Sequence, residues 1–150
     1  MADPLELKYA ALKDPGIRAF MLAGERFYPA NAVSFTMAEQ RGFYDRYCAH
    51  FRKPRPENLA VNDFLVMSVP CRLYAPKLSK DLPVMLYLHG GGYVLGGLES
   101  HDDVCAEISD RAGIAVVGVN YRLAPEHPFP AAFNDAWAVL QHLSGQYDKI

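Results

Sequence analysis

Apolar residues recur every three or four positions through the first fifty residues, a pattern that predicts amphipathic helices. Leu5, Tyr9 and Leu12 would share one face of the first helix. Asp3 precedes this helix and would cap it, because its carboxylate can accept a hydrogen bond from a free backbone N–H. The chain is therefore expected to begin with helical structure.

Two further helix starts follow in this region. The Asp14–Pro15 pair predicts one, since proline is favoured at the first helical position. Thr36 and Glu39 have the spacing of a capping box and predict the other. The third helix would carry an aromatic stripe formed by Phe43, Tyr44, Tyr47 and Phe51. Such a stripe is typical of packing between elements.

After residues 53–56, where two prolines end the helical pattern, the sequence changes to strands. Residues 59–66 and 69–74 predict a hairpin that turns around Met67 and Ser68. Pro70 lacks a backbone N–H and favours an edge position for the second of these strands.

Two short, continuously apolar runs at residues 84–88 and 114–119 predict strands buried on both faces of a parallel sheet. Residues 98–112 between them predict a helix that Gly113 closes. One side of that helix would carry Val104, Ile108 and Ala112. Strand, helix and strand together predict a βαβ unit.

A further helix is predicted over residues 130–143, ending near Gly145. Its apolar face would contain Phe133, Trp137 and Leu140. Asp148, Lys149 and Ile150 then predict the entry into another strand.

Composition narrows the class of protein. The chain has 150 residues, of which 51% are hydrophobic and 21% charged, as expected for one soluble globular unit. A net charge of -2 gives no electrostatic case for nucleic acid or an anionic membrane as partner. The basic residues are scattered apart from Arg52, Lys53 and Arg55, which we interpret as a solvated turn. No apolar run is long enough to span a membrane, and no leader-like start is visible, so we expect a cytoplasmic protein.

The sequence offers no pattern of metal ligands. Cys48, Cys71 and Cys105 are odd in number and far apart, which favours free thiols over disulfides or a zinc site. The five histidines also lack ligand spacing. We expect no metal and no cofactor.

The segment with the strongest chemical signal is His89-Gly90-Gly91-Gly92-Tyr93, which follows an apolar strand and precedes a helix. Ligands bind at the carboxyl ends of strands in open α/β sheets. Three successive glycines remove every Cβ from the turn, so that backbone N–H groups can converge on one point. Two such donors can stabilise an oxyanion.

Other glycine-loop chemistries fit the sequence less well. A dinucleotide-binding G-x-G-x-x-G pattern starting at Gly90 would require glycine where Leu95 stands. A phosphate-binding loop starting at Gly91 would require lysine and then serine or threonine where Gly97 and Leu98 stand. A glycine-rich tight turn without a ligand remains the structural alternative.

Residues 120–132 contain three prolines and predict a rigid corner after a buried strand. Arg122, Glu126 and His127 could form a charged brace within it. We assign His127 this structural role.

Together, residues 89–93, 98–102 and 121–127 resemble the hormone-sensitive lipase family of carboxylesterases and lipases. The resemblance implies an α/β-hydrolase fold with a mostly parallel central sheet. Residues 1–56 would be a helical cap segment, and residues 57–150 the N-terminal half of the hydrolase domain.

By the same resemblance, Gly91 and Gly92 would supply N–H groups to the oxyanion hole, and His89 would brace the loop. Gly90 and Tyr93 would line the substrate site.

The family's nucleophile lies in a G-x-S-x-G pattern that is absent from these residues. None of the serines of the sequence lies in this pattern: Ser34, Ser68, Ser79, Ser100, Ser109 and Ser144. We therefore expect the nucleophile, the acid and the base beyond Ile150, so that the fold is incomplete here. In the fold that this sequence resembles, the strand at 84–88 pairs with a fifth strand, and without it an apolar edge would be exposed.

The resemblance implies a hydrolase that acts on small-molecule esters by serine acyl transfer. The alternative is a non-catalytic member of the same fold, which would bind a ligand or act only with a partner chain. The sequence leaves open whether the protein forms a homo-oligomer.

Overall fold

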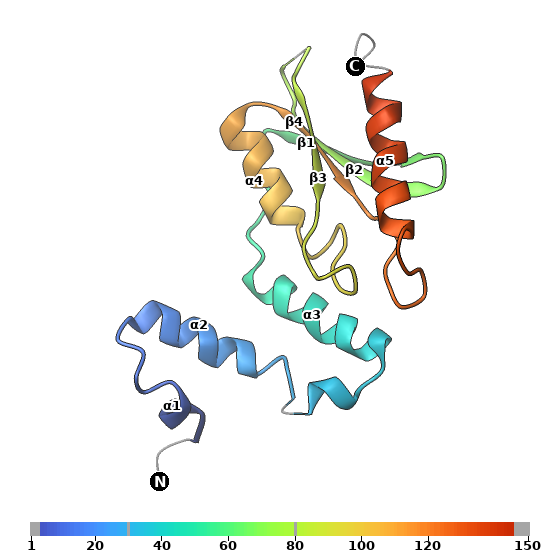
Figure 1. Cartoon of the computed structure of the whole chain (residues 1–150). Helices are drawn as coiled ribbons and strands as arrows, with labels where there is room; N and C mark the ends of the chain where they lie inside the picture. The colour runs from blue at the N-terminus through green and yellow to red at the C-terminus, as the bar shows by residue number, and fades with distance from the viewer. Residues whose placement is uncertain (1–3, 30, 80, 146–150) are drawn as a thin grey trace. The chain divides into compact units, whose positions relative to one another are not determined.

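The computed structural model describes residues 4–29, 31–79 and 81–145 (Figure 1). The chain divides into two compact units, Met1–His50 and Phe51–Ile150. The predicted cap at Asp3 and the strand entry at residues 148–150 lie outside the described residues.

The first unit is helical, as predicted. Its elements in chain order are α1 (Pro4–Lys8), α2 (Pro15–Glu25), the 3-10 helix η1 (Ala32–Ser34) and α3 (Met37–Phe51). The Asp14 carboxylate accepts the Ile17 N–H at 2.9 Å, which confirms the predicted start of α2. The Thr36 hydroxyl accepts the Glu39 N–H while the Glu39 carboxylate accepts the Thr36 N–H, which confirms the capping box.

The extent of the first helix was predicted wrongly. α1 ends at Lys8, so Tyr9 and Leu12 do not share a helical face with Leu5. Backbone N–H groups of Ala10 and Leu12 instead bond to carbonyls three residues earlier, in a turn.

Aromatic contacts hold the first unit together, as the predicted stripe indicated. The ring of Tyr47 meets the rings of Phe20 and Tyr28 edge-on, with centroids 6.0 and 5.9 Å apart. Phe43 packs edge-on against Phe35 at 5.1 Å. None of the described residues of this unit is fully buried, so these contacts form a partly solvated cluster.

The second unit contains a mixed sheet with a helix on each face (Figure 1). Its strands are β1 (Leu59–Val66), β2 (Val69–Pro76), β3 (Val84–Leu88) and β4 (Ala115–Val119), in the order β1-β2-β4-β3. β1 and β2 form the predicted antiparallel hairpin, and β3 and β4 form the predicted parallel pair. The helices are α4 (Asp102–Ala112) and α5 (Ala131–Ser144).

Two apolar clusters cover the two faces of the sheet. Val117 packs with Val139 of α5 on one face, and Val116 packs with Cys105 of α4 on the other. Successive β4 residues point to opposite faces because side chains alternate along a strand. Cys71 and Cys105 are buried thiols outside any disulfide, as predicted, and Cys48 is half-buried.

The edge position predicted from Pro70 is wrong. β2 lies between β1 and β4, and its register with β4 begins at Cys71. Pro70 therefore falls just outside that ladder, where a missing donor costs no ladder hydrogen bond. Its carbonyl still accepts the Asn120 N–H at 2.9 Å.

The buried faces of both helices agree only in part with the predicted ones: Ile108 of α4 packs half-buried against the core, as expected. α4 begins at Asp102 and buries Asp102, Cys105, Ala106 and Ser109, whereas Val104 and Ala112 are exposed. α5 buries Asp135 and Val139. Its predicted apolar face is exposed among the described residues, at Phe133, Trp137 and Leu140. In both helices the buried face contains an ion-paired carboxylate, Asp102 in α4 and Asp135 in α5. A prediction from the apolar residues alone does not include such a residue in the buried face.

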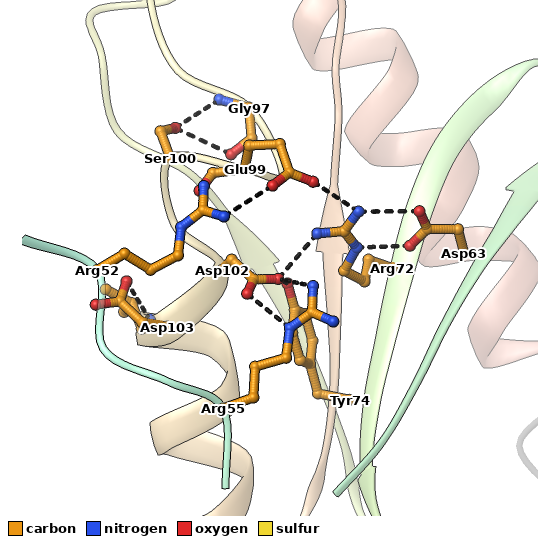
Figure 2. A network of polar contacts seen from close by, with 11 residues as sticks. Arg52, Arg55, Asp63, Arg72, Tyr74, Gly97, Glu99, Ser100, Asp102 and Asp103 are labelled. Carbon is orange, nitrogen blue, oxygen red and sulfur yellow. Dashed lines mark hydrogen bonds and ion pairs between the residues drawn. The ribbon is translucent and has the colours of Figure 1, made fainter. Parts of the chain in front are cut away.

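The basic cluster at residues 52–55 is largely exposed, as expected from the sequence, but its side chains form ion pairs that the sequence did not indicate. Arg52 binds Glu99, and Arg55 binds the buried Asp102 through two hydrogen bonds of 2.7 Å (Figure 2). Lys53 lies 3.8 Å from Glu107. The acidic partners follow about fifty positions later in the chain, so local spacing gave no sign of the pairing.

β3 has β4 as its partner in the described sheet, and its other edge is open. Its residues are half-buried or, at Leu88, 49% exposed. We predict that residues 1–150 expressed alone aggregate as concentration rises, because this apolar edge offers unpaired backbone groups to other chains. Light scattering across a dilution series measures this. A soluble chain that unfolds cooperatively and independently of concentration in calorimetry would contradict it.

Candidate functional site

The turn after β3 has a backbone conformation that only glycine adopts easily. Gly91 has φ of 124° and Gly92 has φ of 62°, both in the left-handed region. A Cβ on Gly91 would lie 2.1 Å from the Leu95 carbonyl oxygen, so a side chain there forces the backbone to move. The Gly91 carbonyl accepts N–H groups from Val94 and Leu95, which closes the turn.

Two backbone donors in this turn are free of protein acceptors. Among the described residues, neither the Gly91 N–H nor the Gly92 N–H donates to a protein acceptor. Gly92 is exposed and Gly91 half-buried, so solvent or a ligand can satisfy these donors. The turn can therefore receive an anionic or strongly polar oxygen.

A cavity of about 600 Å³ lies beside the turn. Its wall includes Gly90, Gly92 and Tyr93 of the predicted site, together with apolar residues of the corner and of α5. The apolar members are Leu88, Ala124, Phe129, Ala132, Phe133 and Ala136. Gly91 does not line the cavity, although it shapes the turn that does.

His89 is buried and held from two sides. Its ring stacks on Tyr121 with centroids 4.1 Å apart, and the Tyr121 hydroxyl donates to the His89 carbonyl. Its Nδ1 lies 2.9 Å from the Gly90 carbonyl, which can only accept, so Nδ1 carries the proton. The structure thus places His89 where it can fix the first peptide of the turn.

The segment after the turn packs against the same histidine. A Cβ on Gly96 would lie 2.7 Å from His89 Nδ1, which shows how closely the two chain stretches approach. The Ser100 hydroxyl accepts the Gly97 N–H at 2.9 Å and lies 2.9 Å from His101 Nδ1. The rings of His101 and His89 are 5.6 Å apart.

The Ser100–His101 pair has nucleophile and base side by side, yet its geometry is that of a loop closure. Ser100 is buried, and the backbone N–H and carbonyl of Gly97 both bind its hydroxyl. In the sequence, this segment contributed only to the family resemblance. Its role emerges from contacts that join the start of α4 to the glycine turn.

The proline-rich corner is braced by an anion that the sequence pattern did not reveal. Arg122 forms a two-pronged ion pair with Asp135 of α5, with Nη2 to Oδ1 at 2.8 Å and Nε to Oδ2 at 2.9 Å. Burial alone raises the pKa of Asp135, but the hydrogen bonds from Arg122 outweigh it and the pKa lies below its usual value. The brace expected from the sequence, formed by Arg122, Glu126 and His127, did not include Asp135, which is the buried carboxylate that binds Arg122.

His127 is exposed at the rim of the cavity, and its backbone N–H donates to the Leu123 carbonyl.

Within the described ranges, no group of three or more His, Cys, Asp or Glu residues is arranged to hold a metal ion. No helix in the described part of the chain is both long enough and apolar enough to cross a bilayer.

Comparisons with known proteins agree with this architecture. Residues 85–149 match a family described as alpha/beta hydrolase fold. A crystal structure of an esterase from the bacterial hormone-sensitive lipase family superposes on 97% of this chain with a TM-score of 0.74 and 31% identity. A hyperthermophilic esterase from Pyrobaculum calidifontis superposes on 77% with a TM-score of 0.69 and 34% identity. The chain therefore has the α/β-hydrolase fold, as predicted.

Within this class, the similarity to the hormone-sensitive lipase family is confirmed. Carboxylesterase NlhH of Mycobacterium tuberculosis is 51% identical over 74 residues, which cover 49% of this chain and 23% of the relative. Ethyl acetate hydrolase of Pseudomonas putida is 49% identical over 88 residues, or 55% of this chain and 27% of the relative. The chain spans about a quarter of these relatives and 44% of the superposed family esterase, so its described sheet is part of the whole fold.

The buried histidines lead to a pH prediction. Burial lowers the pKa of both His89 and His101 below the ordinary value of 6.5, although the Gly90 carbonyl opposes this at His89. The unfolded state therefore binds protons first as the pH falls. We expect the contribution of these two histidines to the free energy of unfolding to be constant above about pH 7 and to decrease from about pH 6.5 downward through the lower folded values.

Urea unfolding at a series of pH values measures this dependence. His89→Gln is expected to reduce the slope below about pH 6.5. His142→Gln, which changes an exposed histidine of α5, serves as the matched control and should leave the slope as it is. An identical slope in the wild type and His89→Gln would contradict the assignment.

Proposed function

We propose that the protein is a carboxylic ester hydrolase that works by serine acyl transfer, and that this chain supplies its oxyanion-binding turn. The observation that carries the proposal is that the Gly91 and Gly92 N–H groups have no acceptor among the described residues and lie in a turn beside a largely apolar cavity. Donors of this kind stabilise the negative charge that develops on a carbonyl oxygen under attack. The esterase names of the similar proteins support the same reaction class.

The chain's own residues would divide the task. Gly91 and Gly92 would donate to the oxyanion, and His89 would brace the turn through its hydrogen bond to the Gly90 carbonyl. Gly90 and Tyr93 would line the substrate site, with the apolar side of the cavity receiving a small ester. A serine outside these residues would attack the ester, assisted by a histidine that an acid orients, and water would release the carboxylic acid.

We also propose that residues 1–56 form a helical cap segment and residues 57–150 the start of the hydrolase domain.

The second candidate is a non-catalytic protein that binds a ligand in the same cavity. The observation that favours it is the cavity of about 600 Å³ beside the glycine turn, which could hold a ligand without turning it over. The anion-binding turn and cavity would serve binding as well as turnover, because a fold alone does not fix function.

A fluorophosphonate serine probe separates the two candidates. The protein at its full encoded length is expected to react stoichiometrically with the probe and to hydrolyse p-nitrophenyl acetate. Residues 1–150 alone are expected to remain unlabelled, since the nucleophile is assigned outside them. A full-length protein that binds esters but neither labels nor hydrolyses them would favour the binding function.

Substitutions in the turn test its role in catalysis. Gly91→Ala places a Cβ against the Leu95 carbonyl, so the turn must move and kcat is expected to fall about 10²- to 10³-fold. Gly92→Ala has room for its Cβ and keeps its N–H, so we expect a smaller loss.

Gly113→Ala is the matched control for these variants. Gly113 also has a left-handed φ, of 66°, and a Cβ added there would meet open space, but it closes α4 away from the turn. The substitution should cost about 1 kcal/mol of stability with kcat unchanged. Equal kcat values for Gly91→Ala and Gly113→Ala in folded protein would contradict the assigned role.

A further inference from the structure

The most deeply buried carboxylate in the network of Figure 2 is that of Asp102, at the first position of α4, with 1% of the residue exposed. It accepts two hydrogen bonds of 2.7 Å from Arg55, one of 2.9 Å from Arg72 and one of 2.8 Å from the Tyr74 hydroxyl. We name Asp102, Arg55, Arg72 and Tyr74 the Asp102 clamp. These hydrogen bonds fix both oxygens of the carboxylate in direction as well as position.

The clamp joins parts of the chain that are distant in sequence. Arg72 belongs to β2, is itself buried, and also binds Asp63 of β1 and Glu99 (Figure 2). Arg55 belongs to the segment between α3 and β1. The start of α4 is therefore tied to the sheet and to the segment that precedes it.

Stability alone does not call for this arrangement. Burying ionic groups carries a desolvation cost, and well-packed apolar residues of similar volume often stabilise a protein as much or more. Burial by itself raises the pKa of Asp102, and the hydrogen bonds from Arg55, Tyr74 and Arg72 reverse this, so that its pKa lies below the usual value. What the ionised clamp adds over an apolar contact is a fixed orientation of the helix start.

From Asp102 a chain of contacts leads to the glycine turn. His101 precedes Asp102 directly, and its Nε2 lies 3.7 Å from where a Cβ on Gly90 would be. Its ring also faces His89, which binds the Gly90 carbonyl. Ser100 holds Gly97 by both backbone groups. A shift of the helix start would therefore move both sides of the turn.

We propose that Asp102 is a positioning residue, whose clamp holds residues 96–101 and thereby sets the direction of the Gly91 and Gly92 N–H groups. The inference rests on the proposed ester hydrolase function. A misplacement of about 1 Å at such donors can cost about a hundredfold in rate, so a clamp remote from the reacting atoms can affect turnover.

The test compares Asp102→Asn with Asp63→Asn in the protein at its full encoded length. Asp102→Asn keeps the shape of the side chain but removes the charge from the clamp. Asp63→Asn removes the charge of another partner of Arg72, an exposed residue of β1, and leaves the carboxylate of α4 in place. The readouts are kcat and KM for p-nitrophenyl acetate and hydrogen exchange of the amides in residues 89–97.

Asp102→Asn is expected to lower kcat at least about tenfold with KM within about twofold, since donors are misplaced while the cavity is retained. Amides of residues 89–97 should exchange faster in this variant, and Asp63→Asn should match the wild type in both readouts. An Asp102→Asn protein with a lower urea midpoint but unchanged kcat and unchanged exchange in residues 89–97 would overturn the proposal.

Arg55→Gln covers the case in which Asp102→Asn does not fold. It leaves Asp102 bound to Arg72 and Tyr74 and removes only the two bonds from a half-exposed side chain. A smaller loss of kcat with faster exchange in residues 89–97 supports the proposal, and wild-type values for both overturn it.

The two proposals fail in different ways. A wild-type protein without ester turnover or probe labelling contradicts the hydrolase function, and the exchange data then decide on the clamp alone. Faster exchange in Asp102→Asn would support the positioning role of Asp102 in the fold, and equal exchange would overturn it.

Discussion

The proposed oxyanion-binding turn depends on one constraint: the Gly91 and Gly92 N–H groups, which have no acceptor among the described residues, must stay available to a ligand. At Gly91 a Cβ would collide with the Leu95 carbonyl, so the conformation excludes side chains there. The turn must therefore be held from outside. His89 stacked on Tyr121 supports its entrance, and the close approach of Gly96 to His89 supports its exit.

The sheet brings these supports together. Tyr121 follows the carboxyl end of β4 and His89 follows that of β3, and the two strands are parallel neighbours in register from Val84 and Ala115 onward. Segments after adjacent parallel strands emerge at the same edge, which is where ligands bind in open α/β sheets. The helices on opposite faces leave that edge accessible, and the cavity lies there.

Local patterns predicted the elements well, because caps and strand periodicity involve residues close in sequence. The Thr36 capping box, the hairpin, the βαβ unit and the helix end at Gly113 were all found. The glycine turn was found by its position after an apolar strand. Ion pairs were missed, since Arg55 meets Asp102 and Arg122 meets Asp135 only in the folded chain. The buried helix faces were missed for the same reason, because each contains one of these carboxylates.

A crystal structure of the protein at its full encoded length, with a phosphonate bound to its nucleophile, tests the central claim most directly. We predict that the phosphonyl oxygen lies about 2.7 to 3.1 Å from the backbone nitrogens of Gly91 and Gly92. A phosphonyl oxygen held by other groups, with these two N–H groups turned toward protein carbonyls, would contradict it.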